Sequence, residues 1–301
     1  MIVPPSPRPG WFALLITLKG SIVPRIAQRC LMVTLLAAAI VLIERRYSDA
    51  FPSISATPFT LLGLSLSIFM SFRNNACYAR WWEARQAWGQ VLSEVRSFAR
   101  QSQVIPNAGL RGSLLRELCG HAHALKARLR DEDEFSAAAC WLPAERHGYG
   151  HNVADGVLRH VGRQCSALAV AEVISEWRYV TLEQRLVALS EAQATCERLH
   201  NTPLPFPYTL LLHRTTFVFC LLLPLVLAEP LGWLAPLFTT VVSYTFFGLD
   251  AIGDELEDPF GDDDNDLAID AMVRQIERDM LDAAGEAELP AAWRPDGVVL
   301  S

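Results

Sequence analysis

The sequence predicts an all-α integral membrane protein with four transmembrane helices and a helical cytoplasmic bundle. Its 301 residues are 51% hydrophobic and 20% charged. This is too apolar for an ordinary soluble chain and too charged for a compact transporter with many spans. Four apolar segments, taken with their flanks, reach the length that a bilayer requires. They form two pairs separated by a long amphipathic region, so part of the chain lies in lipid.

The first pair of apolar segments forms a membrane hairpin over residues 30–72. Its spans are Cys30–Ile43 and Thr57–Phe72, and the linker between them is Glu44–Ala56. Long side chains at both ends of the first span can extend it by snorkelling to the interface. Residues 1–29 precede this hairpin as a cytoplasmic segment.

The second hairpin covers residues 208–252. Its spans are Thr215–Ala228 and Gly232–Ile252, joined by the short linker Glu229–Leu231. The pair His213-Arg214 stands at the entry to this hairpin. Ionisable groups near lipid can relay protons, but the charge distribution places this pair at the cytoplasmic end, where an anchoring role is favoured.

Positive charge orients the hairpins in a cell membrane. Arginine and lysine residues lie before the first span and after the second, whereas the outer linkers contain few or none. Because cytoplasmic flanks carry the excess of positive charge, both termini and the middle region are expected in the cytoplasm. The residues that carry this bias are Arg8, Lys19, Arg25, Arg29, Arg73, Arg80 and Arg85.

Residues 73–207 form a helical cytoplasmic region. Apolar residues recur there with helical spacing, and loop residues gather in Trp141–Gly156. No Gly or Pro interrupts the stretch from Gly63 to Gly89. One helix is therefore expected to continue from the membrane into the cytoplasmic bundle, anchored there by Trp81, Trp82 and Trp88.

Two stripes of residues run along the second span. Leu64, Ile68 and Phe72 recur at i, i+4 and i+8 and form a bulky stripe. A neighbouring stripe consists of small residues, which favour close packing of membrane helices. This small stripe contains Gly63, Ser67 and Ser71. Periodicity alone leaves open whether the bulky stripe faces lipid or something else.

Two motifs in this order carry a family resemblance. "FRNNACYARWWEARQAWG", Phe72–Gly89, and "EDPFGDDDND", Glu257–Asp266, resemble the segments that follow the second and fourth spans of bestrophins, above all of the bacterial branch. The Pro-rich entry to the third span and the order of four spans agree. The resemblance extends from about Lys19 to about Met280.

The resemblance implies a homopentameric ion channel, so the expected partners are copies of the chain itself, the lipid bilayer and permeant inorganic ions. Five copies of the second span would surround one pore. Leu64, Ile68 and Phe72 would form its hydrophobic neck. A second, cytoplasmic constriction is assigned to Leu182. The resemblance implies no enzymatic activity and no required cofactor.

Monovalent cations are the expected permeant ions, with chloride as the alternative. Animal bestrophins conduct chloride, and some bacterial relatives conduct cations. An apolar neck selects neither sign of charge. The net charge of −7 in each chain favours cations near a pentameric vestibule. The same charge, with no run of Lys or Arg, argues against a nucleic-acid partner.

The acidic segment after the fourth span has two interpretations. Matching it to the calcium clasp of animal bestrophins places a divalent cation at Glu255, Asp258, Asp263 and Asp266. Acids replace amides at two of these positions, which argues against the same calcium gating. Alternatively, the acids cap and solvate the helix that begins at Leu267.

Two further patterns suggest chemistry that the rest of the chain does not support. Asp262–Asp266 fits a DDxxD pattern, in which carboxylates bind Mg²⁺ and a diphosphate in membrane prenyltransferases. A second Asp-rich motif is missing. Cys119-Gly-His121-Ala-His123 resembles a zinc motif, but i, i+2 spacing on a helix separates the ligands. These residues are expected to be solvated. All seven cysteines occur singly and are expected as free thiols.

Overall fold

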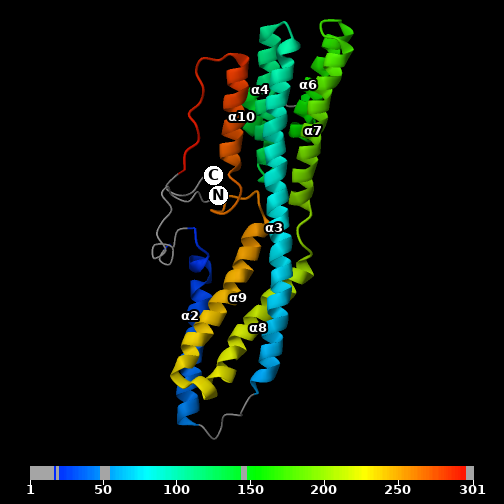
Figure 1. Cartoon of the computed structure of the whole chain (residues 1–301). Coiled ribbons are helices and arrows are strands. Elements are labelled where there is room, and N and C mark those ends of the chain that lie inside the picture. The colour runs from blue at the N-terminus through cyan, green and yellow to red at the C-terminus, as the bar shows by residue number, and fades with distance from the viewer. Residues whose placement is uncertain (1–16, 18–19, 48–54, 144–147, 296–301) are drawn as a thin grey trace. The chain divides into compact units, whose positions relative to one another are not determined.

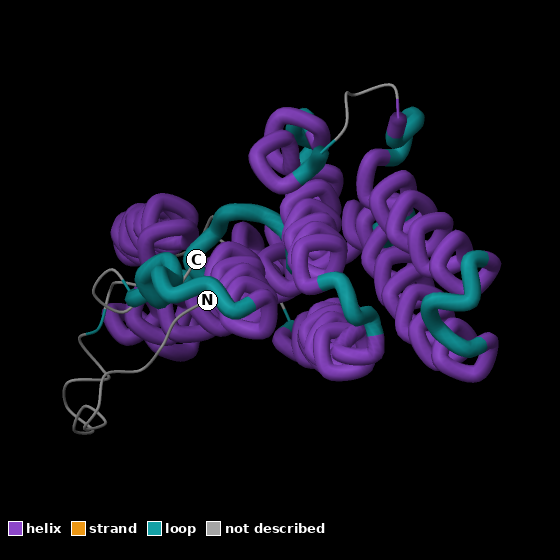
Figure 2. The backbone as a smooth tube through the Cα atoms, turned by 90° about the horizontal axis from the view of Figure 1, so that it is seen from above, coloured by secondary structure: helices purple, strands orange, loops and turns teal. Residues whose placement is uncertain are grey.

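A computed structural model describes residue 17 and residues 20–47, 55–143 and 148–295 (Figure 1). All regular structure in these ranges is helical, and Figure 2 shows helices joined by loops with no strand among the described residues. The prediction of an all-α protein is confirmed. The linker expected at Glu44–Ala56 lies partly outside the described residues.

The chain forms two compact units. Of the described residues, those within 17–81 and 203–258 form the membrane unit, and those within 82–202 and 259–295 form the polar unit. Helix α3 belongs to both. The predicted boundaries follow the two membrane hairpins and fall after residues 29, 72, 207 and 252. The membrane unit extends beyond these positions because polar contacts continue past the apolar segments. For example, the Arg80 Nε donates to the Glu257 carbonyl at 3.2 Å.

Helix α3 is a single helix over Ala56–Gln101, as the absence of Gly and Pro between Gly63 and Gly89 predicted. The other helices of the membrane unit include a proline in the first turn of each, where the missing N–H costs nothing. These helices are α2 (Val23–Arg46), α8 (Phe206–Leu231) and α9 (Ala235–Glu257), with the 3₁₀ turn η5 (Gly232–Leu234) between the last two.

Two helical stretches of the described residues are long and apolar enough to cross a membrane. They are Val23–Arg46 and Phe206–Glu257, and the second includes both α8 and α9. Each remains mostly unburied within the chain, as expected of helices that contact lipid. The predicted span Thr57–Phe72 does not reach the same hydropathy, because Ser, Thr and Gly alternate with its large apolar residues.

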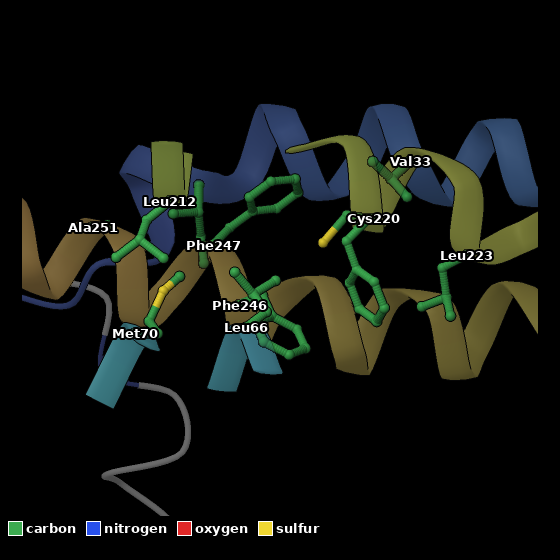
Figure 3. Packing of buried hydrophobic residues seen from close by; sticks show 11 residues of the cluster. Val33, Leu66, Met70, Leu212, Cys220, Leu223, Phe246, Phe247 and Ala251 are labelled. Atoms are coloured by element: carbon green, nitrogen blue, oxygen red, sulfur yellow. The ribbon is translucent and has the colours of Figure 1, made fainter. Parts of the chain in front are cut away.

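The core of the membrane unit brings together side chains from four helices. Figure 3 shows Val33 of α2, Leu66 and Met70 of α3, Cys220 and Leu223 of α8, and Phe246 and Phe247 of α9 in one buried cluster. The rings of Phe219 and Phe246 meet edge to face, with their centroids 5.1 Å apart. Such packing, rather than exclusion from water, stabilises helices that associate within lipid.

The polar unit is a bundle of α4 (Ala108–Leu129), α5 (Glu134–Ala138), α6 (Val153–Val170), α7 (Glu176–Asn201) and α10 (Ile269–Ala284) with the polar half of α3. Short 3₁₀ turns occupy Ser102–Val104 and Ala139–Trp141. Asparagine caps begin two of the helices: the Asn107 side chain accepts from the Leu110 N–H, and that of Asn152 accepts from the Asp155 N–H. Helix α10 ends at Gly285, whose φ of 86° is left-handed.

Candidate functional site

The part of α3 that belongs to the membrane unit packs on the other helices of that unit with one narrow face. The buried residues Leu66, Met70, Arg73 and Cys77 are spaced by i, i+4, i+7 and i+11, which places them on a single stripe. In Figure 3, Leu66 and Met70 lie beside Phe246 and Phe247. Most of the other residues on this part of the helix are exposed.

The predicted bulky stripe points away from this packed face. Leu64, Ile68 and Phe72 are 60%, 47% and 61% exposed. At about 100° per residue, their mean direction is roughly 180° from that of the packed stripe. Large apolar side chains left exposed in this way require a lipid, a neighbouring chain or a pore lumen around them.

The small stripe lies between the bulky stripe and the packed face. A Cβ on Gly63 would approach the ring of Phe219 on α8 to 3.1 Å, so glycine permits close helix packing there. The side chains of Ser67 and Ser71 are exposed. The Ser67 hydroxyl donates to the Gly63 carbonyl at 2.9 Å, which leaves a smooth surface on which a neighbouring helix can pack.

Leu182, the residue assigned to a cytoplasmic constriction, does not lie on a free surface. Its side chain is 0% exposed and points into the polar unit with Leu186 and Leu189 of the same helix face. Burial inside its own protomer does not support a place on a lumen, and the constriction at Leu182 stays a prediction. Helix α7 has apolar residues on both faces, and the sequence does not distinguish them.

The tryptophans that follow the second span differ in burial. Trp88 is fully buried in the polar unit, whereas Trp82 is half exposed. Trp81 belongs to the membrane unit and faces Tyr78, with the ring centroids 6.4 Å apart. Of the three predicted anchors in the bundle, Trp88 is the one that the structure buries.

The predicted divalent-cation residues fall in both units. Glu255 and Asp258 belong to the membrane unit, and Asp263 and Asp266 to the polar unit. Glu255 forms an ion pair with Arg25 at 3.1 Å, and the Asp263 N–H donates to the Asp266 carboxylate at 2.8 Å. Among the described residues, no three His, Cys, Asp or Glu side chains form a group suited to a metal ion. The divalent site stays a prediction.

The acidic segment does not cap the helix that follows it. Helix α10 begins at Ile269, and its N-cap position is Ala268, without a side-chain cap. Asp270 in the first turn instead binds Lys126 and Arg130, each at 2.9 Å. Hydrogen bonds from Lys126 and Arg130 and their charges outweigh burial and lower the pKa of Asp270. Arg130 also pairs with Asp262 at 3.1 Å, so this acid of the DDxxD pattern has a structural partner.

The Cys119–His123 motif is buried rather than solvated. Cys119 and His121 are fully buried, and the Nδ1 of His121 lies 3.1 Å from the Ala154 carbonyl, to which it donates. His123 instead pairs with Glu277 at 2.6 Å. The side chains diverge, as i, i+2 spacing predicted, and each has its own structural environment.

The burial of His121 predicts a pH-dependent stability. Desolvation lowers its pKa to about 4, so the unfolded chain binds this proton more readily than the folded one. Stability from this residue is complete above the ordinary histidine pKa and is lost as pH falls toward 4. From about pH 7.5 to about pH 5 the expected loss is about 2 kcal/mol. Thermal unfolding of the whole chain in detergent measures it, and His121→Leu should flatten this part of the pH profile. An equally steep profile in the variant would contradict the assignment.

Comparison with known proteins places these features in one family. The model of the bacterial and fungal bestrophin proteins matches residues 1–282. The chain belongs to the bacterial and fungal bestrophin family. Its structure is similar to the crystal structure of a bacterial bestrophin homolog from Klebsiella pneumoniae, with a TM-score of 0.84 and 34% identity over 87% of this chain and 100% of that one.

Curated relatives cover nearly the whole chain. A protein of Mesorhizobium japonicum, named a voltage-dependent anion channel-forming protein, is 42% identical over 93% of this chain and 92% of its own length. The protein YneE of Escherichia coli, with the same description, is 35% identical over 96% of this chain and 97% of its own length. Bestrophins are a channel family and not an enzyme family, so the prenyltransferase alternative is not supported.

Sequence reasoning missed one set of polar residues in the membrane unit. Arg73 was counted only as a flanking charge and His213 as an anchor, but both contact Asp250, which lies inside the predicted fourth span. An acidic residue within a membrane segment requires a partner. Asp250 was the signal in the sequence that a buried pair existed.

Proposed function

We propose that the chain forms a homopentameric membrane channel for small inorganic anions. The observation that carries this proposal is the bulky stripe of Leu64, Ile68 and Phe72, which the protomer leaves exposed opposite its packed face. In a ring of five chains these side chains line a hydrophobic neck. The small stripe beside them, with Ser67 and Ser71, packs against the next copy.

The modest hydropathy of α3 supports its place around a pore. The helices α2, α8 and α9 are apolar enough to face lipid, whereas α3 exposes Ser and Thr residues among its large apolar side chains. A helix between a lumen and its neighbours contacts little lipid, so it does not need an apolar surface all round. The proposed topology places both termini in the cytoplasm, as the arginine distribution predicts.

Anions replace the predicted monovalent cations as the proposed permeant ions. The cation prediction rested on the net charge of −7 per chain, which describes the whole surface and not the ion path. The names of the relatives favour the alternative, because they are described as anion channel-forming proteins. Ions pass an apolar neck when it is wide enough to fill with water. Such a neck carries no fixed charge that opposes anions.

Reversal potentials in planar bilayers test this proposal. Under a KCl gradient, the current of the purified protein should reverse near the chloride equilibrium potential. Replacing chloride by gluconate should reduce the current, and replacing potassium by N-methylglucamine should leave it unchanged. A reversal near the potassium equilibrium potential would restore the cation prediction. Mass measurement in detergent should give five chains of 33.4 kDa, and a monodisperse monomer or dimer would contradict the pentamer.

A further inference from the structure

Arg73 directly follows the last residue of the bulky stripe, but its side chain lies on the packed face of α3, about 100° around the helix from Phe72. The side chain is 0% exposed, buried between α3 and its neighbours in the membrane unit. A buried guanidinium needs acceptors for its donors and an opposite charge nearby. Both terminal nitrogens of Arg73 have them, whereas its Nε has no hydrogen-bond partner among the described residues. The position of α3 is therefore tied to the groups that surround Arg73.

Three carboxylates on one face of α9 surround the guanidinium. Nη1 donates to Asp250 at 3.2 Å, and Nη2 donates to Asp254 and, at 3.3 Å, to Glu257. The three acids are spaced by i, i+4 and i+7 and so share one side of the helix. The planar fork of arginine contacts all three, which a single ammonium group cannot do with the same geometry.

The same cluster reaches a third helix. The second carboxylate oxygen of Asp250 lies 2.7 Å from the Nδ1 of His213 on α8. Asp250 is 1% exposed, and its two oxygens contact Arg73, which is buried, and His213, which is half buried. One carboxylate thus links α3, α8 and α9. Next to it, the Asn74 amide donates to the Leu249 carbonyl at 3.0 Å, which adds a further polar link between α3 and α9.

A glycine on α9 leaves room for this arrangement. A Cβ at Gly253 would lie 2.8 Å from the Arg73 Nη1 and 2.7 Å from the Asn74 Oδ1. Such distances are too short for real contacts, so any larger residue displaces Arg73. Gly248 on the same helix offers a comparison. Its Cβ would lie 2.9 Å from the Cδ1 of Ile22, the N-cap residue of α2, and 3.9 Å from the Cδ1 of Ile26, so it would displace the flexible tip of an apolar side chain and no charged group.

We propose that Arg73 is the positioning residue of the pore helix, which sets the rotation and height of Leu64, Ile68 and Phe72 without reaching the lumen itself. This inference rests on the proposed pore. Buried ionic groups are best attested as devices that fix register. A rotation of α3 that moved the bulky stripe out of the lumen would also pull the guanidinium off its carboxylates. The cluster therefore selects one orientation of the neck among those that apolar packing alone permits.

Gly253→Ala and Arg73→Lys test the proposal from the two sides of the cluster. The first displaces Arg73 without changing any charge, and the second keeps the charge but removes the fork. Both should change single-channel conductance at least threefold while the mass of the assembly stays that of wild type. The matched control is Gly248→Ala, the same substitution on the same helix, which should keep the wild-type conductance within a factor of about 1.5.

A milder variant keeps the test informative should both of these fail to assemble. Asp254 is half exposed, so Asp254→Asn removes the negative charge of one partner of Arg73 while Asp250 and Glu257 keep theirs. It should alter conductance by about twofold with normal assembly. If Gly253→Ala and Arg73→Lys assemble and show wild-type conductance, the inference is overturned. If neither of them assembles, wild-type conductance in Asp254→Asn overturns it. So does an equal change in Gly248→Ala. A wild-type protein that carries no current would overturn the proposed channel, and the positioning role with it.

Discussion

Ile68→Ala should increase the current through the proposed channel about fivefold. Ile68 is the middle residue of the bulky stripe, and the substitution removes one side-chain tip from each of five chains at the same height. A wider neck that wets more easily lowers the barrier to ion passage, and a barrier lower by about 1 kcal/mol corresponds to a flux about fivefold higher. Single-channel recording of wild type and variant under the same voltage and salt measures the change.

Ser67→Ala is the matched control for this prediction. It lies one residue away on the small stripe, where the loss of a hydroxyl bound to its own helix should leave assembly and current nearly unchanged. The reverse result would have an equally clear meaning. If Ser67→Ala alters conduction while Ile68→Ala only weakens the assembly, then the small stripe lines the lumen and the proposed orientation of α3 is wrong.

Arg73→Met should destabilise the membrane unit by about 3–5 kcal/mol per chain, the cost of leaving a buried ion without its partner. Asp250 remains buried and then faces the apolar methionine, with His213 as its remaining partner from a side chain. Asp254 and Glu257 are more exposed and tolerate the loss. The melting temperature of the detergent-solubilised protein should fall on the order of 5–10 °C.

The double variant with Arg73→Met and Asp250→Leu separates charge burial from packing. Apolar residues of similar volume often replace a buried ion pair without loss of stability, so this variant should recover most of the melting temperature. A single Arg73→Met variant as stable as wild type would show that the guanidinium is not buried in the membrane unit. A double variant no more stable than the single one would show that packing, and not charge, holds α3.

The sequence by itself determined the helices, the stripes and the family. Helical periodicity and unbroken apolar stretches are local properties, so α3 and the spans around it were predictable from neighbouring residues. The bulky stripe is also local, because i, i+4 and i+8 define one face of any helix. The motifs at Phe72–Gly89 and Glu257–Asp266 identified the bestrophin family, which the comparison confirmed.

Only the tertiary structure decided which faces are buried and which charges are paired. Leu182 and Val187 are both apolar residues of α7, but one is buried and the other is half exposed. Arg73 and Asp250 are separated by 177 positions, and His213 and Asp250 by 37. Burial and ion pairing depend on what the rest of the chain brings to each residue, and no local pattern contains that information. The partners of a buried charge are therefore a property of the folded protein.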